Sequence, residues 1–259
     1  MTKYIAFLIA APLAFGQTPT YSSTVSYHVP DETRVAYETW WKDKGRKLSE
    51  GVMQEDANIT AVVLTRVIFG GTIAPEANYY MTTFSKDVPK NNAVAYEKIA
   101  QKLWGKSYDA VLKEAYPLRK RLGQTLARSI ATAPGTPVEE GDIVRVDRKK
   151  ITPGRFGDYM QVEQQYQPLR AAQVTAGNMK AWSAWGLVLP AGSERDYDAY
   201  TSHVVKDLAG SLNWNRGGSA MAAKLEPPLN YSALTSRASD TSKTTVGETR
   251  LVVGVVRRK

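Results

Sequence analysis

Apolar and polar positions along the chain follow two periods that alternate in a regular order. Apolar residues three or four apart, as in amphipathic helices, follow Pro30 and recur at residues 91–104 and 109–122, the last segment being interrupted at Pro117. Between them, β-branched and apolar residues alternate or run together, as strands do, at residues 24–29, 59–69, 78–84 and 124–131. The first half of the chain is therefore predicted to run strand–helix–strand–strand–helix–strand.

The second half repeats this order. Strands are predicted at residues 143–149, 179–189, 197–205 and 248–256. Thr152-Pro153-Gly154 begins a helix after the first of these strands, and residues 208–225 form a broken helical region. Residues 226–243 are polar and are predicted to form a loop. Each half thus predicts one ferredoxin-like βαββαβ unit.

A segment rich in proline, glycine and acidic residues separates the two halves at residues 134–141 and is read as a linker. The first unit is then residues 17–133 and the second unit is residues 142–259. A shift of 121 residues superposes the identical pairs Val25 and Val146, Arg34 and Arg155, Leu48 and Leu169, Gly71 and Gly192, and Tyr79 and Tyr200. The repeated order and these matches predict a tandem duplication.

This tandem pattern resembles the dimeric α+β barrel superfamily, which includes the NIPSNAP, antibiotic-biosynthesis monooxygenase and EthD-like proteins. The resemblance rests on the Ile-Thr-Pro-Gly-Arg-Phe turn at residues 151–156 and on the hairpins around residues 69–71 and 189–192. It implies an α+β fold in which two tandem ferredoxin-like units form an α+β barrel within one chain. No catalytic residue of the superfamily matches a position here, so the resemblance implies none.

The first sixteen residues have the pattern of a secretory signal. Lys3 precedes an apolar run at residues 4–15, and small residues stand ahead of Gln17. A buried N-terminal helix is the alternative, which Pro12 disfavours. We predict cleavage after residue 16 and a periplasmic or secreted protein. No later apolar run is long enough to span a bilayer, so no membrane association is predicted after cleavage.

Composition excludes several kinds of chemistry. The 259-residue chain has no cysteine and two histidines, His28 and His203, so thiolate and histidine-rich metal sites are excluded, and we predict no metal and no cofactor. Either histidine is a possible general base or haem ligand, but neither has a partner carboxylate at a defined spacing. The net charge is +9. Because the basic residues are scattered and no nucleic-acid-binding motif accompanies them, no nucleic acid partner is predicted.

Polar or aromatic side chains that interrupt apolar strands are the candidate ligand contacts, because a buried polar group needs a partner. These candidates are Arg66, Tyr80, Trp182, Tyr200 and His203. Each also has a structural interpretation, as a core aromatic residue or as one member of an internal ion pair. Strand alternation places Tyr200 and His203 on opposite faces, and it separates Trp182 from Trp185 in the same way.

Many aromatic residues and few candidate catalytic titratable groups favour a protein that binds a small apolar or aromatic molecule in a pocket bounded by the sheets. The superfamily resemblance implies an alternative, a cofactor-independent enzyme of the monooxygenase or isomerase kind. A structural or interaction module without a ligand is a third alternative. Whether the chain is an enzyme, and whether it is a monomer or a homodimer, stays open at this stage.

Overall fold

The computed structural model describes residues 20–70, 76–192 and 195–258. The predicted signal peptide at residues 1–16 lies outside these ranges, as does Gly71 of the first predicted hairpin. Within the described ranges, no helix is both long and apolar enough to cross a membrane. The strands are β1 Tyr21–His28, β2 Ile59–Phe69, β3 Tyr79–Ser85, β4 Lys120–Ala133, β5 Ile143–Ile151, β6 Ala181–Leu189, β7 Ala199–Val205 and β8 Ser242–Arg257.

These eight strands of the described chain close into one barrel in the order β1-β3-β2-β8-β5-β7-β6-β4. Every neighbouring pair is antiparallel. The order within the first half is β4-β1-β3-β2, and the order within the second half is β8-β5-β7-β6. The pairs β2–β8 and β4–β6 join the two halves. The fold is therefore mixed α+β, as predicted, with a barrel that one chain closes.

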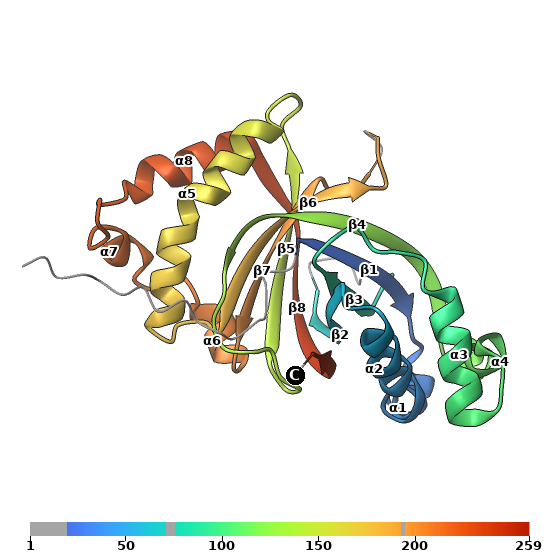
Figure 1. Cartoon of the computed structure of the whole chain (residues 1–259). Helices are drawn as coiled ribbons and strands as arrows, with labels where there is room; N and C mark the ends of the chain where they lie inside the picture. The colour runs from blue at the N-terminus through green and yellow to red at the C-terminus, as the bar shows by residue number, and fades with distance from the viewer. Residues whose placement is uncertain (1–19, 71–75, 193–194, 259) are drawn as a thin grey trace, which may run out of the picture.

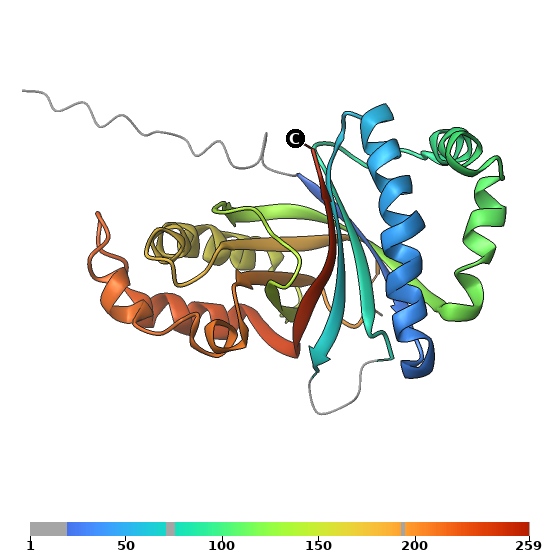
Figure 2. The ribbon, with the colours of Figure 1, turned by 90° about the horizontal axis from the view of Figure 1, so that it is seen from below.

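The helices cover the outside of the barrel in two groups, one from each half (Figure 1; Figure 2). The groups cross the boundary between the halves, because α5 packs on β4 and α2 packs on β8. A π-helical turn at Trp41–Gly45 joins α1 to α2, and short 3₁₀ turns lie at Asp31–Thr33 and Tyr116–Leu118. The helices are α1 Arg34–Trp40, α2 Arg46–Glu55, α3 Ala93–Trp104, α4 Tyr108–Lys113, α5 Phe156–Thr175, α6 Leu208–Asn213, α7 Gly218–Ala222 and α8 Tyr231–Thr241.

The two-sided burial predicted for β2 is confirmed. Val62 and Leu64 belong to the core that the first-half helices cover, with 4% and 0% of their surfaces exposed. Val63, between them, is 8% exposed and points into the barrel. The continuous apolar run of this strand follows from its position, because a strand with helices on one face and a barrel on the other has no solvated face.

The polar segment at residues 226–243 was predicted as a loop, and this was wrong for most of it, because α8 occupies Tyr231–Thr241. The side chain of Asn230 accepts a hydrogen bond from the Ala233 amide and caps the helix. Leu234, which is 3% exposed, packs with Tyr166 and Leu169 of α5. Tertiary burial of a few apolar residues thus forms a helix where local composition disfavours one.

The helix predicted over residues 109–122 also ends early. α4 stops at Lys113, a 3₁₀ turn at Tyr116–Leu118 contains Pro117, and β4 begins at Lys120. Proline has no N–H to donate to a continuing helix, which explains the break. The strand gains residues 120–122, which the sequence pattern assigned to the helix, and Gly123.

The predicted shift of 121 residues between the halves is wrong for the strands. It pairs Tyr79, which packs under the first-half helices, with Tyr200, which lines the inside of the barrel. It likewise pairs outward-facing Val25 with inward-facing Val146. Because successive strand residues face opposite sides, an odd shift exchanges the two faces. Matching strands of the two halves therefore need an even shift.

Candidate functional site

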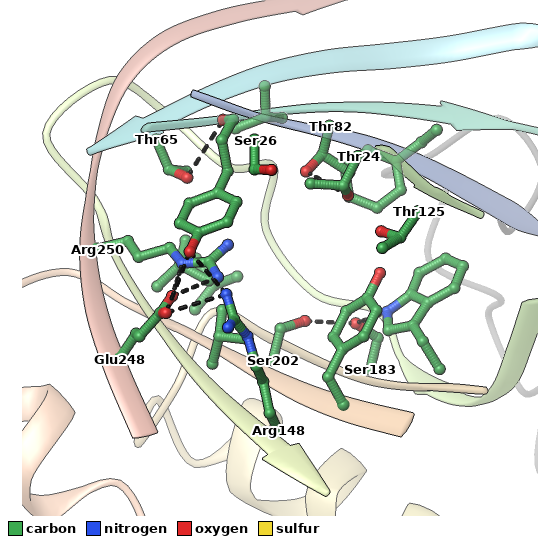
Figure 3. Close-up of a pocket in the computed structure, with 18 of the residues that line it drawn as sticks. Thr24, Ser26, Thr65, Thr82, Thr125, Arg148, Ser183, Ser202, Glu248 and Arg250 are labelled. Atoms are coloured by element: carbon green, nitrogen blue, oxygen red, sulfur yellow. Dashed lines mark hydrogen bonds and ion pairs between the residues drawn. The ribbon is translucent and has the colours of Figure 1, made fainter. Parts of the chain in front are cut away.

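The barrel encloses a cavity of about 750 Å³. Every one of the eight strands contributes alternate residues to its wall, and Figure 3 shows many of their side chains converging on the cavity. The wall combines hydroxyl, aromatic and charged side chains. Ligand cavities in small-molecule-binding proteins are commonly of this size.

Hydroxyl groups form one part of the wall (Figure 3). The hydroxyls of Thr24 and Thr82 lie 3.0 Å apart on β1 and β3, and those of Ser183 and Ser202 lie 2.7 Å apart on β6 and β7. Thr125 of β4 also points into the cavity. Such side chains can donate and accept, so they can serve either kind of polar group on a bound molecule.

Aromatic rings form a second part of the wall. Trp185 and Tyr200 stack with ring centroids 6.2 Å apart and planes inclined by 17°, and Phe84 lies 5.7 Å from Trp185. The rings are held in place, because the Trp185 indole N–H donates to Ser183 Oγ at 2.7 Å and the Tyr200 hydroxyl lies 2.6 Å from Ser22 Oγ. Burial raises the pKa of the Tyr200 phenol, which keeps it protonated.

A charged cluster forms a third part of the wall. Glu248 on β8 is 1% exposed. Its carboxylate lies 3.0 Å from a guanidinium nitrogen of Arg148 and accepts from Arg250 Nε at 2.8 Å and from the Tyr80 hydroxyl at 3.2 Å. Arg148 also donates to the Tyr80 hydroxyl at 2.6 Å. Two guanidinium groups share one carboxylate, so the cluster carries an excess positive charge inside the barrel.

Tyr80 is fixed by the same cluster. The guanidinium carbon of Arg250 lies 3.6 Å from the centroid of its ring, a cation–π contact. Burial raises the pKa of the Tyr80 phenol, and the neighbouring Arg250 and Arg148 oppose this shift. The phenol therefore stays protonated at neutral pH and acts as a hydrogen-bonding group.

The five predicted ligand contacts lie in three places. Tyr80 and Tyr200 line the barrel cavity. The Trp182 side chain packs in the core between the barrel and the second-half helices, with Met179 and Val205, although the residue borders the barrel cavity as well. Arg66 lies on the outer face and donates to Glu38 at 2.9 Å, which is the structural interpretation of that residue.

His203 lies on the opposite face of β7 from Tyr200, as strand alternation predicts. It is 2% exposed and borders a second cavity, between the barrel and the second-half helices. His28, the other histidine, is exposed and its Nδ1 lies 3.0 Å from the carbonyl oxygen of Glu76. Among the residues that the structure describes, no cluster of histidine, aspartate and glutamate could hold a metal ion.

The charged cluster was not predicted from the sequence. There, Arg148 is one of the scattered basic residues, and Glu248 and Arg250 are positions of the last predicted strand. A signal was present, because Glu248 and Arg250 are two residues apart and so share one face of a strand that is otherwise mostly apolar. Trp185, which stacks in the cavity, was passed over in favour of Trp182.

No protein-family model matches the sequence, and no curated protein matches it. Solved structures do match. A monooxygenase candidate from Lactobacillus acidophilus aligns over 93% of this chain and 97% of its own, with a TM-score of 0.59 and 8% identity. A monooxygenase candidate from Fusobacterium nucleatum aligns over 93% of this chain and 96% of its own, with a TM-score of 0.54 and 9% identity. An anthrone oxidase-like protein aligns over 93% of this chain and 94% of its own, with a TM-score of 0.50 and 8% identity. At these identities the likeness shows the fold alone, and the chain shares the dimeric α+β barrel fold with these proteins.

Proposed function

We propose that the barrel cavity binds a planar aromatic molecule that carries hydroxyl or carbonyl oxygens. The observation that carries this proposal is the cavity of about 750 Å³, ringed by the eight strands and lined by aromatic, hydroxyl and charged side chains. Most of the lining surface is apolar, which suits a hydrophobic ring system. The hydrogen-bonding groups among it suit a ligand with polar atoms at fixed positions.

The aromatic part of the wall supports a planar ligand. Trp185, Tyr200 and Phe84 present ring faces and edges to the cavity, and a flat ring packs on such groups in stacked or edge-on geometry. Because Ser183 and Ser22 hold two of these rings in position, little side-chain entropy is lost when a ligand packs against them.

The charged part of the wall supports an oxygen on the ligand. Glu248 accepts a hydrogen bond from Arg250 and forms an ion pair with Arg148, and one carboxylate neutralises only one of the two guanidinium charges. An electron-rich oxygen, such as a phenolic or carbonyl oxygen, is attracted to the excess positive charge. The hydroxyls of Thr24, Thr82 and Thr125 are available to a second oxygen.

Binding rather than turnover is the better-supported function. Glu248 is the buried carboxylate of the cavity, and two guanidinium groups and a phenol already occupy its oxygens. A catalytic base needs a free lone pair directed at the proton that it removes. A cofactor-independent oxygenase is the second candidate, favoured by the likeness to proteins named as monooxygenase candidates and anthrone oxidase-like.

The test is calorimetric titration with 2-naphthol and with anthrone. Thr125→Trp fills the cavity from β4 and breaks no side-chain hydrogen bond given by the structure, so we expect it to abolish binding and to leave the melting temperature unchanged. Thr245→Trp, on an exposed position of β8, is the matched control and should bind like the wild type. Failure of both compounds to bind, or equal binding to Thr125→Trp, would contradict the proposal and favour a structural module.

The oxygenase candidate is tested in the same samples. Oxygen consumption in the presence of anthrone, abolished by Thr125→Trp and retained by Thr245→Trp, would establish turnover in the barrel. Binding without oxygen consumption would assign the chain as a binding protein for this compound class.

We also infer that the two halves arose by duplication of a ferredoxin-like unit. The strand orders β4-β1-β3-β2 and β8-β5-β7-β6 support this inference, because they correspond strand for strand. Homologous chains that contain a single half and pair with a second copy would strengthen it. Superposition of the two halves only with displaced strand orders would contradict it.

Export is a further proposal, which the apolar run at residues 4–15 supports. Expression in a bacterial host followed by fractionation and intact mass measurement is the test. We expect a periplasmic or secreted chain that begins at Gln17. An uncleaved chain confined to the cytosol would contradict the proposal.

A further inference from the structure

A second cavity of about 530 Å³ lies on the opposite side of the sheet from the barrel cavity, between the outer face of the second half and the helices that cover it. β5, β7 and β8 form its floor, and α5 and α8 contribute its other walls. The side chains that matter here are His203 on β7, Arg170 on α5 and Trp214, the residue that follows α6.

His203 borders this cavity with unused hydrogen-bonding capacity. The residue is 2% exposed, and neither Nδ1 nor Nε2 has a hydrogen-bond partner among the residues that the structure describes. The main chain of the opposite β5 residue, Arg145, lies beside the ring, without the geometry of a formed hydrogen bond. A buried polar group without a partner destabilises a protein by about 1–3 kcal/mol.

Arg170 borders the same cavity with an unneutralised charge. The residue is 7% exposed, and no carboxylate of the described chain lies within ion-pair distance of it. Its Nη1 donates to Gln173 Oε1 at 2.8 Å and to Asn215 Oδ1 at 3.1 Å, while its Nε has no partner. Buried charges in proteins are ordinarily paired, so an unpaired guanidinium beside a cavity indicates an anionic occupant.

Trp214 brings the two groups together. Its ring centroid lies 3.9 Å from that of His203, and the Arg170 guanidinium carbon lies 4.6 Å from the centroid of the same indole. Gln173, which is fully buried, holds both the arginine and the Trp214 carbonyl. The arginine is therefore fixed before any ligand binds, as a preorganised site requires.

The other charges around the cavity leave it electropositive. Burial and the charges of Arg170, Arg145 and Lys149 hold the pKa of His203 well below its usual value. Of the two carboxyl groups that face the cavity, Asp147 is paired with Arg145 at 3.2 Å. Burial raises the pKa of the other, Glu163 on α5, which favours its uncharged form.

We propose that this second cavity binds a small carboxylate anion beside Arg170 and a neutral His203, the two residues with unused donors in its wall. The body of the ligand lies against the Trp214 ring. This site is separate from the barrel cavity, so it does not depend on the function proposed for that cavity, and the probes that test the two sites differ.

The experiment titrates the full chain with succinate, which has no aromatic ring, and with inorganic phosphate as a second anion, by calorimetry and by the difference in tryptophan fluorescence between the wild type and Trp214→Phe. We expect succinate to bind, and His203→Leu and Arg170→Met each to weaken it by about tenfold or more, the loss of a hydrogen bond to a charged group. His28→Leu removes the chain's other histidine, at an exposed position, and should bind succinate like the wild type.

Thermal melting of the ligand-free variants separates a binding role from a structural one. His203→Leu replaces an unpartnered polar ring by an apolar side chain, so its melting temperature should equal or exceed that of the wild type. Two results would overturn the proposal. One is a marked loss of stability in His203→Leu together with no succinate binding by the wild type, as expected for a ring satisfied by ordered water. The other is binding of phosphate but not succinate.

Discussion

The two halves of the protein cover the outside of the barrel with layers of different density. In the first half, Tyr37 and Tyr79 are 0% and 1% exposed, and their rings meet edge to face at 5.2 Å. Arg119 lies 4.0 Å above the Tyr27 ring and donates to the Tyr37 hydroxyl at 3.0 Å. The outer layer of the first half is therefore a closely packed aromatic core that includes Arg119.

In the second half, an arginine also lies on aromatic rings, but these rings border a cavity. Arg170 lies over Tyr166 and Trp214 at 4.9 and 4.6 Å, but a cavity of about 530 Å³ lies beside these rings. An arginine packed on aromatic rings thus serves packing in one half and, by our proposal, recognition in the other. The difference teaches that the same kind of contact stabilises a filled layer and is available for recognition where it borders a cavity.

The largest test of this comparison removes an indole from each layer. Trp41 of the first half is 2% exposed and belongs to the aromatic core. Trp41→Ala should lower the free energy of unfolding by about 3–5 kcal/mol, as measured by urea denaturation. Trp214→Ala, beside the second cavity, should lose less than about 2 kcal/mol, because the ring packs against fewer side chains. Equal losses would mean that the two layers are equally well packed.

A smaller test adds one methyl group. A Cβ atom at Gly254 of β8 would lie 2.1 Å from the Trp41 Nε1 atom, so Gly254→Ala should destabilise the protein by about 1–3 kcal/mol through overpacking. Gly123→Ala on β4 is the matched control, since its nearest neighbour, Ser26 Oγ, lies 3.6 Å away. A near-neutral Gly254→Ala would show that the first layer has room to adjust.

The third test uses pH. Burial and nearby positive charges hold the pKa of His203 well below 6.5. Below pH 6.5 the unfolded chain therefore binds a proton at this residue that the folded chain does not, and stability falls as the pH falls. Relative to His203→Leu, the wild type should lose up to about 1.4 kcal/mol per pH unit between the unfolded and the folded pKa, as measured by urea denaturation at pH 7 and pH 5.5.

Two controls isolate the contribution of His203 to the pH dependence of stability. Asp147 and Glu163 also face the cavity, but they are present in both proteins. A second control comes from the profile itself, because its difference from His203→Leu reports the replaced ring. Parallel pH profiles for the wild type and His203→Leu would mean that folding does not lower the pKa of His203.

The smallest expected effect concerns Arg66. Its ion pair with Glu38 joins side chains that are 25% and 24% exposed, and Glu38 keeps a hydrogen bond from the Tyr79 hydroxyl at 2.6 Å without it. Arg66→Met should therefore lose only about 0.5–1 kcal/mol. It should leave the affinity for 2-naphthol unchanged, because the side chain lies outside the barrel. A changed affinity would place Arg66 in the binding machinery after all.

The element order could be predicted from the sequence because periods of two and of three to four residues are strong in this chain. α8 could not, because its stability depends on Leu234 packing against α5, a contact 65 to 72 residues away in sequence from Leu169 and Val162. Local patterns carry no information about such a partner.

The candidate site was predictable in part for a related reason. Alternation showed that Trp182 and Trp185 face opposite ways, but it could not show which of them faces the inside of the barrel. That choice depends on the direction in which the sheet curves when β4 pairs with β6 and β2 pairs with β8. The charged cluster depends on the same closure, since it brings Tyr80 of β3 against Arg148 of β5 and Glu248 of β8.

Closure by a single chain has one more consequence. A barrel assembled from two identical chains about a twofold axis must present every inward side chain twice, at symmetry-related places. Here Glu248 and its two arginines occur once and face a wall of threonines (Figure 3). Because one chain forms both halves, the barrel cavity need not be symmetric. It can therefore distinguish the two ends of an asymmetric ligand and hold that ligand in a single orientation.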